Sequence, residues 1–229
     1  PVPDTNRPNA GFRGSLDECV EEFTRSMGPP LLTRFQPVSA ATDLTEGLTI
    51  ETIQGLGIHL AKSPSLYAAI RCGDTGQNGN GGHAHNDQLS LELTLEGLDR
   101  TIDPGTYLYT PLPDRRNEFR STTAHFTPRP SAPKDAEQAT WTSGASGLFR
   151  LGNEARATVH YFGEDGWVGQ HDGFNEPVVR VVRFSPDAVE VLDFGAASPG
   201  GVHSTVSNGY GRLSPNSIAG SLPPSRRIR

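Results

Sequence analysis

A short polar stretch, residues 79–88, carries the side chains best suited to chemistry. It reads Gly-Asn-Gly-Gly-His-Ala-His-Asn-Asp-Gln, so His83 and His85 follow a glycine-rich approach. A carboxylate, Asp103, and a further histidine, His125, stand later in the chain. Two imidazoles and a carboxylate suit Zn²⁺ and leave a fourth position for water or substrate. His85, Asp103 and His125 are therefore the predicted metal ligands, with hydrogen-bonded structural histidines as the alternative.

A hairpin predicted directly after the histidines would position this group. Leu89–Leu95 alternates strictly between apolar and polar residues, which is typical of a half-buried strand with its leucines inward. Glu96-Gly97 is a turn-type pair, and the return strand is expected over Arg100–Asp103. The carboxylate then returns toward the end of the hairpin that holds His85. On a strand, a His-x-His pair places both rings on one face, with Cα atoms about 7 Å apart.

Three short segments follow one another in a distinctive order. They are His-Ala-His-Asn-Asp-Gln-Leu-Ser at 83–90, Ile-Asp-Pro-Gly-Thr-Tyr at 102–107 and Arg-Ser-Thr-Thr-Ala-His at 120–125. Together they resemble the C-terminal β-domain of heparinase II/III-like polysaccharide lyases. The resemblance is densest over residues 80–127 and thinner from about 48 to 210. In lyases of this kind a zinc ion is bound by positions matching His85, Asp103 and His125.

The resemblance also implies roles for other polar residues. The histidine matching His83 lies in the active cleft of these lyases, so His83 is expected to be catalytic or to neutralise the substrate carboxylate. A guanidinium binds a carboxylate or sulfate bidentately, and Arg120, together with Asn117, is the expected substrate contact.

Other candidates near this region are assigned no chemistry. Arg115 and Arg116 read as a solvated charge run within a loop region over 111–137. Tyr107 and Tyr109 are two residues apart, share a predicted strand face and are expected to pack.

Short apolar segments separated by Gly, Pro and Asp turns predict an all-β fold, a large antiparallel β-sandwich of the super-sandwich type with one short N-terminal helix. Residues 1–47 are expected to form a linker and the helix, 48–210 the sandwich, and 211–229 a disordered tail. The helix is predicted from a Ser15/Glu18 capping box and an apolar stripe. Further strands are expected over 49–53, 57–61, 65–72, 140–142, 147–151, 155–162, 167–170, 178–184 and 188–194.

Composition limits the partners. The net charge of −6 argues against generic binding of nucleic acid or anionic membranes. No run of about 18 apolar residues is present, so no membrane span is expected. The two cysteines provide no disulfide framework. A leader pattern is not visible, and a periplasmic or secreted location is expected only from the substrate class that the resemblance implies.

The implied reaction is β-elimination in a uronic-acid-containing acidic polysaccharide. In these lyases the cleft lies between an α/α toroid and the β-domain, and the toroid carries the base. With one predicted helix, the toroid is expected to be missing, so the chain is a fragment or a module of reduced activity. A non-catalytic carbohydrate-binding or structural sandwich that keeps the metal is the alternative. A cupin-like metalloenzyme is disfavoured, because Leu89 and Ser90 stand where cupins place a glutamate after the second histidine.

Overall fold

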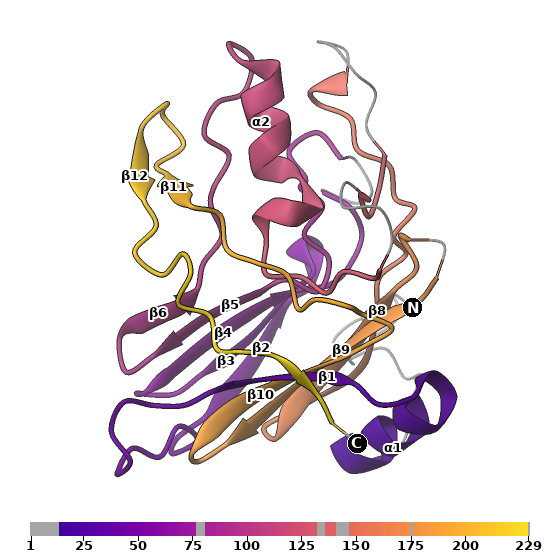
Figure 1. Cartoon of the computed structure of the whole chain (residues 1–229), viewed down its shortest axis with the longest axis vertical. Coiled ribbons are helices and arrows are strands. Elements are labelled where there is room, and N and C mark those ends of the chain that lie inside the picture. Colours follow the sequence, from indigo (N-terminus) through magenta and orange to yellow (C-terminus); the bar gives the residue numbers. More distant parts are fainter. Residues whose placement is uncertain (1–13, 77–80, 132–135, 141–146, 175, 229) are drawn as a thin grey trace, which may run out of the picture.

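Two large antiparallel sheets form the body of the computed structural model, which describes residues 14–76, 81–131, 136–140, 147–174 and 176–228 (Figure 1). One sheet has the order β13-β1-β10-β9-β8-β7, the other β2-β3-β4-β5-β6, and β11 pairs with β12 in a separate ribbon. The elements are α1 (Leu16–Met27), β1 (Leu31–Phe35), β2 (Thr49–Ile53), η1 (Gln54–Leu56), β3 (Ile58–Lys62), β4 (Leu66–Arg71), β5 (Leu91–Leu95), β6 (Leu98–Thr101), α2 (Pro113–Arg120), η2 (Thr122–Ala124), β7 (Thr158–Gly163), β8 (Gly166–His171), β9 (Val178–Ser185), β10 (Ala188–Phe194), β11 (Thr205–Ser207), β12 (Leu213–Pro215) and β13 (Arg226–Arg227). The predicted all-β sandwich is confirmed.

The two sheets share one hydrophobic core. Ile70 and Leu93 from the five-stranded sheet lie in the same buried cluster as Trp167 and Val191 from the six-stranded sheet. On the other face of the six-stranded sheet, Leu16 and its neighbours on α1 form a second cluster with β8, β9 and β10. Strand β9 is therefore covered on both faces, which explains why its apolar residues do not alternate with polar ones.

The predicted helix is confirmed as α1, and its capping box is formed. The Glu18 N–H donates to Ser15 Oγ at 3.3 Å, and the Ser15 N–H donates to Glu18 Oε2 at 2.6 Å. These bonds satisfy two amide groups that a helix start otherwise leaves open. Gly28, at φ +81°, ends the helix.

Two elements lie where irregular chain was expected. Strand β1 pairs with β10 although it precedes residue 48, and its apolar side chains divide between the two clusters, with Phe35 in one and Leu32 in the other. A strand buried on both faces has no alternation to detect. Helix α2 occupies part of the expected loop region 111–137 and begins with Pro113 in its first turn, where proline fits.

Two other expectations also differ from the structure. The segment 211–228 is not a featureless tail, because β12 pairs with β11 and β13 pairs with β1. Residues 147–151 form a turn rather than a strand. Of the expected strand at 140–142, residues 141–142 lie outside the described residues and Thr140 is not in a strand. The start of the glycine-rich stretch at 79–80 also lies outside the described residues. No helix in the described part of the chain has the length and apolar character needed to cross a bilayer.

Candidate metal centre

The three predicted ligands come together from three separate segments. His85 lies in the loop before β5, Asp103 lies just after β6, and His125 follows η2. One potential ligand atom from each lies within 4.8 Å of the other two. The imidazole centroids are 5.4 Å apart, and His125 Nδ1 is 2.9 Å from Asp103 Oδ2.

The two nearby histidines do not share a strand face as expected. Residues 81–90 form turns and bends, and β5 begins only at Leu91. Leu89 is fully buried and has φ +62°, so the chain changes direction just before the strand. As a result, His85 is turned toward His125, whereas His83 is exposed and its ring lies 5.4 Å from that of Tyr109.

The surroundings of the group fit a bound metal ion. His125 is buried. Its Nδ1 faces Asp103 Oδ2 at 2.9 Å, and its Nε2 makes no hydrogen bond with a described residue. Buried nitrogens are rarely left without a partner. Asp103 uses Oδ1 to accept the Gly105 N–H at 2.7 Å and turns Oδ2 toward His125. Its side chain is 32% exposed, so solvent or substrate can approach the group from that side.

Burial and mutual charge set the protonation of the group. Burial, reinforced by His125, lowers the pKa of His85 to about 4, so this imidazole is neutral at pH 7, as metal ligation requires. Burial opposes ionisation of Asp103, yet the neighbouring His125 outweighs it and holds the pKa of Asp103 below its usual range. Burial likewise opposes charge on His125, but Asp103 prevails and raises the pKa of His125.

A tight turn after Asp103 adds a further polar contact. The Leu108 N–H donates to the Thr106 carbonyl at 2.9 Å, closing a γ-turn around Tyr107, whose φ is +62°. This turn fixes Thr106, and its Oγ1 lies 3.3 Å from His85 Nε2. The tyrosine thus lies in a strained turn and not on the strand that its spacing suggested.

One buried arginine forms hydrogen bonds with both of the segments that carry the histidines. Arg180 of β9 is fully buried and pairs with Asp193 through Nε and Nη2, at 2.8 and 2.9 Å. Its Nη1 donates to the carbonyls of Leu89 and Phe126, at 2.8 and 2.6 Å, and Nη2 also donates to Pro199. The Leu89 and Phe126 carbonyls lie on the segments that carry His85 and His125, respectively. This role was not predicted, although the charge inside the run Val-Val-Arg-Val-Val was a usable signal.

Asn86 connects the His85 loop, through Glu137, to the segment that precedes His125. Its Nδ2 donates to Glu137 Oε2 at 2.7 Å and to the Ala139 carbonyl at 2.9 Å, while the Ala139 N–H donates back to Asn86 Oδ1. Glu137 Oε2 also accepts from the backbone and hydroxyl of Thr122. Asn86 therefore ties the histidine loop to the backbone of Ala139.

The predicted substrate contacts Arg120 and Asn117 are engaged within the protein. Arg120 is fully buried, and its guanidinium donates to the carbonyls of Gly147 and Leu148, at 3.0 and 3.3 Å. Asn117 Oδ1 accepts from Arg120 Nε at 2.8 Å. Direct contact of this pair with substrate stays a prediction, and their surroundings indicate that they position residues 147–150. The interpretation of Arg116 as solvated is wrong, because it too is fully buried.

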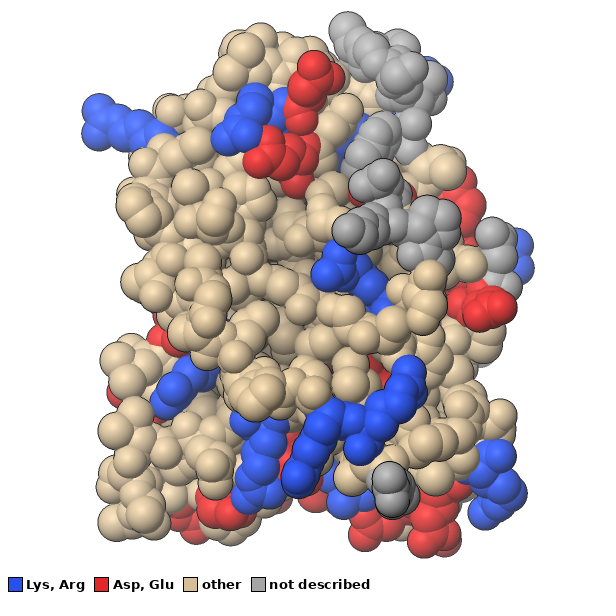
Figure 2. All heavy atoms as spheres, in the orientation of Figure 1, with Lys and Arg blue, Asp and Glu red and all other residues tan. Residues whose placement is uncertain are grey.

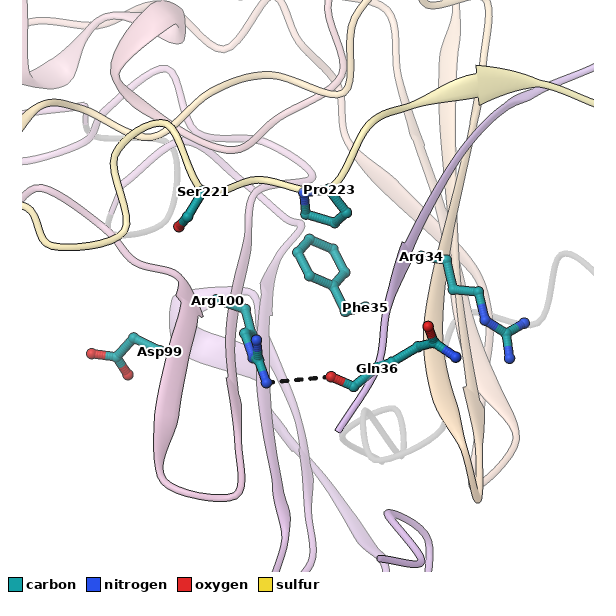
Figure 3. A pocket seen from close by; sticks show the side chains of 7 residues that line it. All are labelled: Arg34, Phe35, Gln36, Asp99, Arg100, Ser221 and Pro223. Carbon is teal, nitrogen blue, oxygen red and sulfur yellow. Dashed lines mark hydrogen bonds between the residues drawn. The ribbon is translucent and has the colours of Figure 1, made fainter. Parts of the chain in front are cut away.

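A separate pocket of about 270 Å³ lies away from these residues. It is lined by Arg34, Phe35, Gln36, Asp99, Arg100, Ser221 and Pro223 (Figure 3). Arg34 pairs with Asp187 and Glu190, and Arg100 donates to the Gln36 carbonyl at 3.3 Å. On the face shown in Figure 2, Lys and Arg side chains gather in the lower part, with acidic side chains beside them. The cationic lining of the pocket is therefore partly compensated within the protein.

Comparison with known proteins gives one family and several distant structures. The family described as Heparinase II/III-like, C-terminal, matches residues 53–193. A heparinase III gene product with methylated lysines is 12% identical, with a TM-score of 0.41, and the match covers 79% of this chain and 27% of that one. The heparan sulfate lyase HepC from Pedobacter heparinus is 17% identical, with a TM-score of 0.37 and coverages of 80% and 28%. The present chain thus spans little more than a quarter of either protein. No curated protein sequence matches it significantly.

Proposed function

This chain belongs to the heparinase II/III-like C-terminal family, and from that premise we propose that it is the β-domain of a polysaccharide lyase. The proposed reaction is β-elimination in an acidic polysaccharide that contains uronic acid. One observation supports this proposal most strongly. The family match spans His85, Asp103 and His125, and their potential ligand atoms lie within 4.8 Å of one another. The exposed His83 is two residues from His85.

The chemistry assigns distinct tasks to the groups in this region. The C5 proton of a uronate is weakly acidic, so positive or hydrogen-bonding groups must stabilise the carboxylate as charge develops. His83 is exposed and can reach a substrate, either to neutralise that carboxylate or to transfer a proton. We propose that His85, Asp103 and His125 hold zinc, which when bound would supply positive charge and join the three segments.

The remaining groups would come from outside this chain. We propose that an α/α toroid domain completes the cleft and contributes the base, and that the complete protein acts in the periplasm or outside the cell. The chain alone would then bind metal and contribute His83 without turning over substrate efficiently.

The lyase proposal is tested by restoring a helical domain. The chain joined to a family toroid is incubated with heparan sulfate, alginate or starch, and the ultraviolet absorbance of the unsaturated uronate is followed. We expect product from at least one acidic polymer and none from starch. A folded, zinc-loaded protein that releases no product from either acidic polymer would contradict the proposal and favour the non-catalytic alternative.

The zinc site can be tested on the chain alone by elemental analysis after chelation and zinc return. We expect roughly one zinc ion per chain, as in a three-residue site with an open position. His85→Ala and His125→Ala should each weaken zinc binding by more than the roughly 10–100-fold typical of losing an outer hydrogen-bond partner. They should also lower the melting temperature in zinc but not in chelator.

The control for the zinc experiment is His160→Ala, which removes an imidazole from β7 that packs on Phe23 and lies outside the ligand group. It should retain zinc. Equal zinc content in the wild type and in both ligand variants would exclude this site.

A further inference from the structure

A second cluster of side chains lies next to His83 and is not needed to hold a metal. The rings of Tyr109 and Phe149 are nearly parallel, at 7°, with centroids 6.2 Å apart. The His83 ring meets both edge-on, at 5.4 and 5.9 Å. Each of the two aromatic side chains is 39% exposed. They therefore present apolar surface beside the proposed catalytic histidine.

A buried cation lies behind these rings. The Arg116 guanidinium carbon is 4.8 Å from the Tyr109 centroid and 4.9 Å from the Phe149 centroid. Nε donates to the Leu148 carbonyl at 2.9 Å, and Nη2 donates to the Gly82 carbonyl at 3.1 Å. Nη1 is buried and has no hydrogen-bond partner among the described residues. No acidic side chain forms an ion pair with Arg116 in the described part of the chain, so its charge is not cancelled at close range.

The backbone holds this arrangement in place. A Cβ atom on Gly81 would clash with the Leu151 carbonyl oxygen, so the histidine loop crosses the 147–151 segment in direct contact. Arg116 bridges the same two segments through its bonds to Gly82 and Leu148. The two rings are consequently fixed relative to His83 before any ligand arrives, which reduces the ordering cost of binding.

These features match the chemistry of an acidic sugar. An aromatic side chain offers a broad apolar surface on which the C–H face of a pyranose ring can pack. A positive charge a few ångströms behind that surface, in a medium of low dielectric constant, favours an anionic ligand over a neutral one. The His83 ring centroid is 5.4 Å from that of Tyr109 and 5.9 Å from that of Phe149, which is close enough to meet a carboxylate or sulfate on the stacked sugar.

We propose that Tyr109 and Phe149, backed by Arg116 and flanked by His83, form a subsite that stacks one acidic sugar residue of the substrate. The subsite rests on the proposed function for the identity of its ligand. It does not require catalysis, so binding by this chain tests it separately. The subsite also gives a role in binding to Tyr109, which the sequence predicted to be a packing residue, and to Arg116, which the sequence predicted to be solvated.

Binding is measured by titration calorimetry on the whole chain with three hexasaccharides. The heparan sulfate probe carries sulfate and carboxylate, the alginate probe carries carboxylate alone, and maltohexaose is neutral. We expect at least one acidic probe to bind, and more tightly than maltohexaose. Tyr109→Ala and Phe149→Ala should each weaken that binding by roughly threefold to tenfold. Arg116→Met should reduce the preference for the acidic over the neutral probe.

The matched control is Tyr67→Ala, an exposed tyrosine on β4 that should leave affinity unchanged. Unfolding midpoints and zinc content show whether each variant keeps its fold. Equal affinity in the wild type and in both aromatic variants would overturn the subsite, as would a wild type that prefers neither acidic probe to maltohexaose. Binding by this chain that depends on Tyr109, together with no lyase turnover in the protein completed by a toroid, would support the subsite and reject the proposed reaction.

Discussion

Replacing Arg180 with methionine should lower the free energy of unfolding by roughly 3–5 kcal/mol, the range seen when one partner of a buried ion pair is removed. All five N–H groups of Arg180 have acceptors, two on Asp193 and three on carbonyls. Methionine would leave the buried Asp193 carboxylate unpaired, and burial already raises the pKa of that group. Urea unfolding followed by circular dichroism measures the loss.

Two variants separate this effect from the general cost of mutating β9. Arg183→Met alters an arginine on the same strand whose partner, Asp17, has a side chain 75% exposed, so the expected loss is below about 1 kcal/mol. Arg180→Met with Asp193→Leu removes both buried charges and should recover part of the stability. If Arg180→Met lowered the free energy of unfolding as little as Arg183→Met does, the Arg180–Asp193 pair would contribute no more than a surface ion pair.

The same variant should weaken zinc binding even though Arg180 is not a ligand. Its Nη1 holds the carbonyls of Leu89 and Phe126, which lie on the two segments that carry the ligand histidines. Zinc content measured under conditions where the variant is still folded tests this connection.

His83→Ala, in the protein completed by a toroid, should reduce kcat by about 10²–10⁴-fold, the contribution of a positioned acid or base. His83 is exposed, lies outside the ligand group and is two residues from His85. Zinc content and the unfolding midpoint should therefore stay close to those of the wild type. The measurement is the initial rate of unsaturated uronate formation at saturating polymer.

The control for His83 is His160→Ala, which changes a histidine remote from the proposed cleft and should retain turnover. A rise in KM at unchanged kcat in His83→Ala would assign His83 to substrate binding alone. Full retention of both kcat and KM would remove it from the mechanism.

That His85, Asp103 and His125 lie together was predictable from sequence, because these residues belong to short segments that resemble one family. Its geometry was only partly predictable. The His-x-His spacing suggested a shared strand face, but the left-handed turn at Leu89 places the histidines in loop. A turn of this kind in a leucine leaves no mark in the sequence, because glycine or asparagine normally signals it.

Helix α2 was missed for a reason that also hid the aromatic subsite. Its buried residues Arg116, Phe119 and Arg120 have helical spacing, yet two of the three are arginines. Hydrophobic periodicity detects burial only when the buried side chains are apolar. Here burial depends on carbonyl acceptors and aromatic rings from a distant segment, such as those of Leu148 and Phe149. Tertiary contacts of this kind cannot be deduced from local pattern.

The γ-turn at Tyr107 bears on how this protein can evolve. A non-glycine residue in a sparsely populated backbone region costs roughly 1–3 kcal/mol, and Tyr107 at φ +62° bears such a cost beside Thr106 and His85. A lineage selected for thermal resistance alone would drift toward glycine or asparagine at this position. A lineage that keeps a bulky aromatic there is trading robustness for the orientation of its neighbours. The residue at position 107 is therefore expected to differ between relatives selected for the cleft that we propose and relatives selected for stability alone.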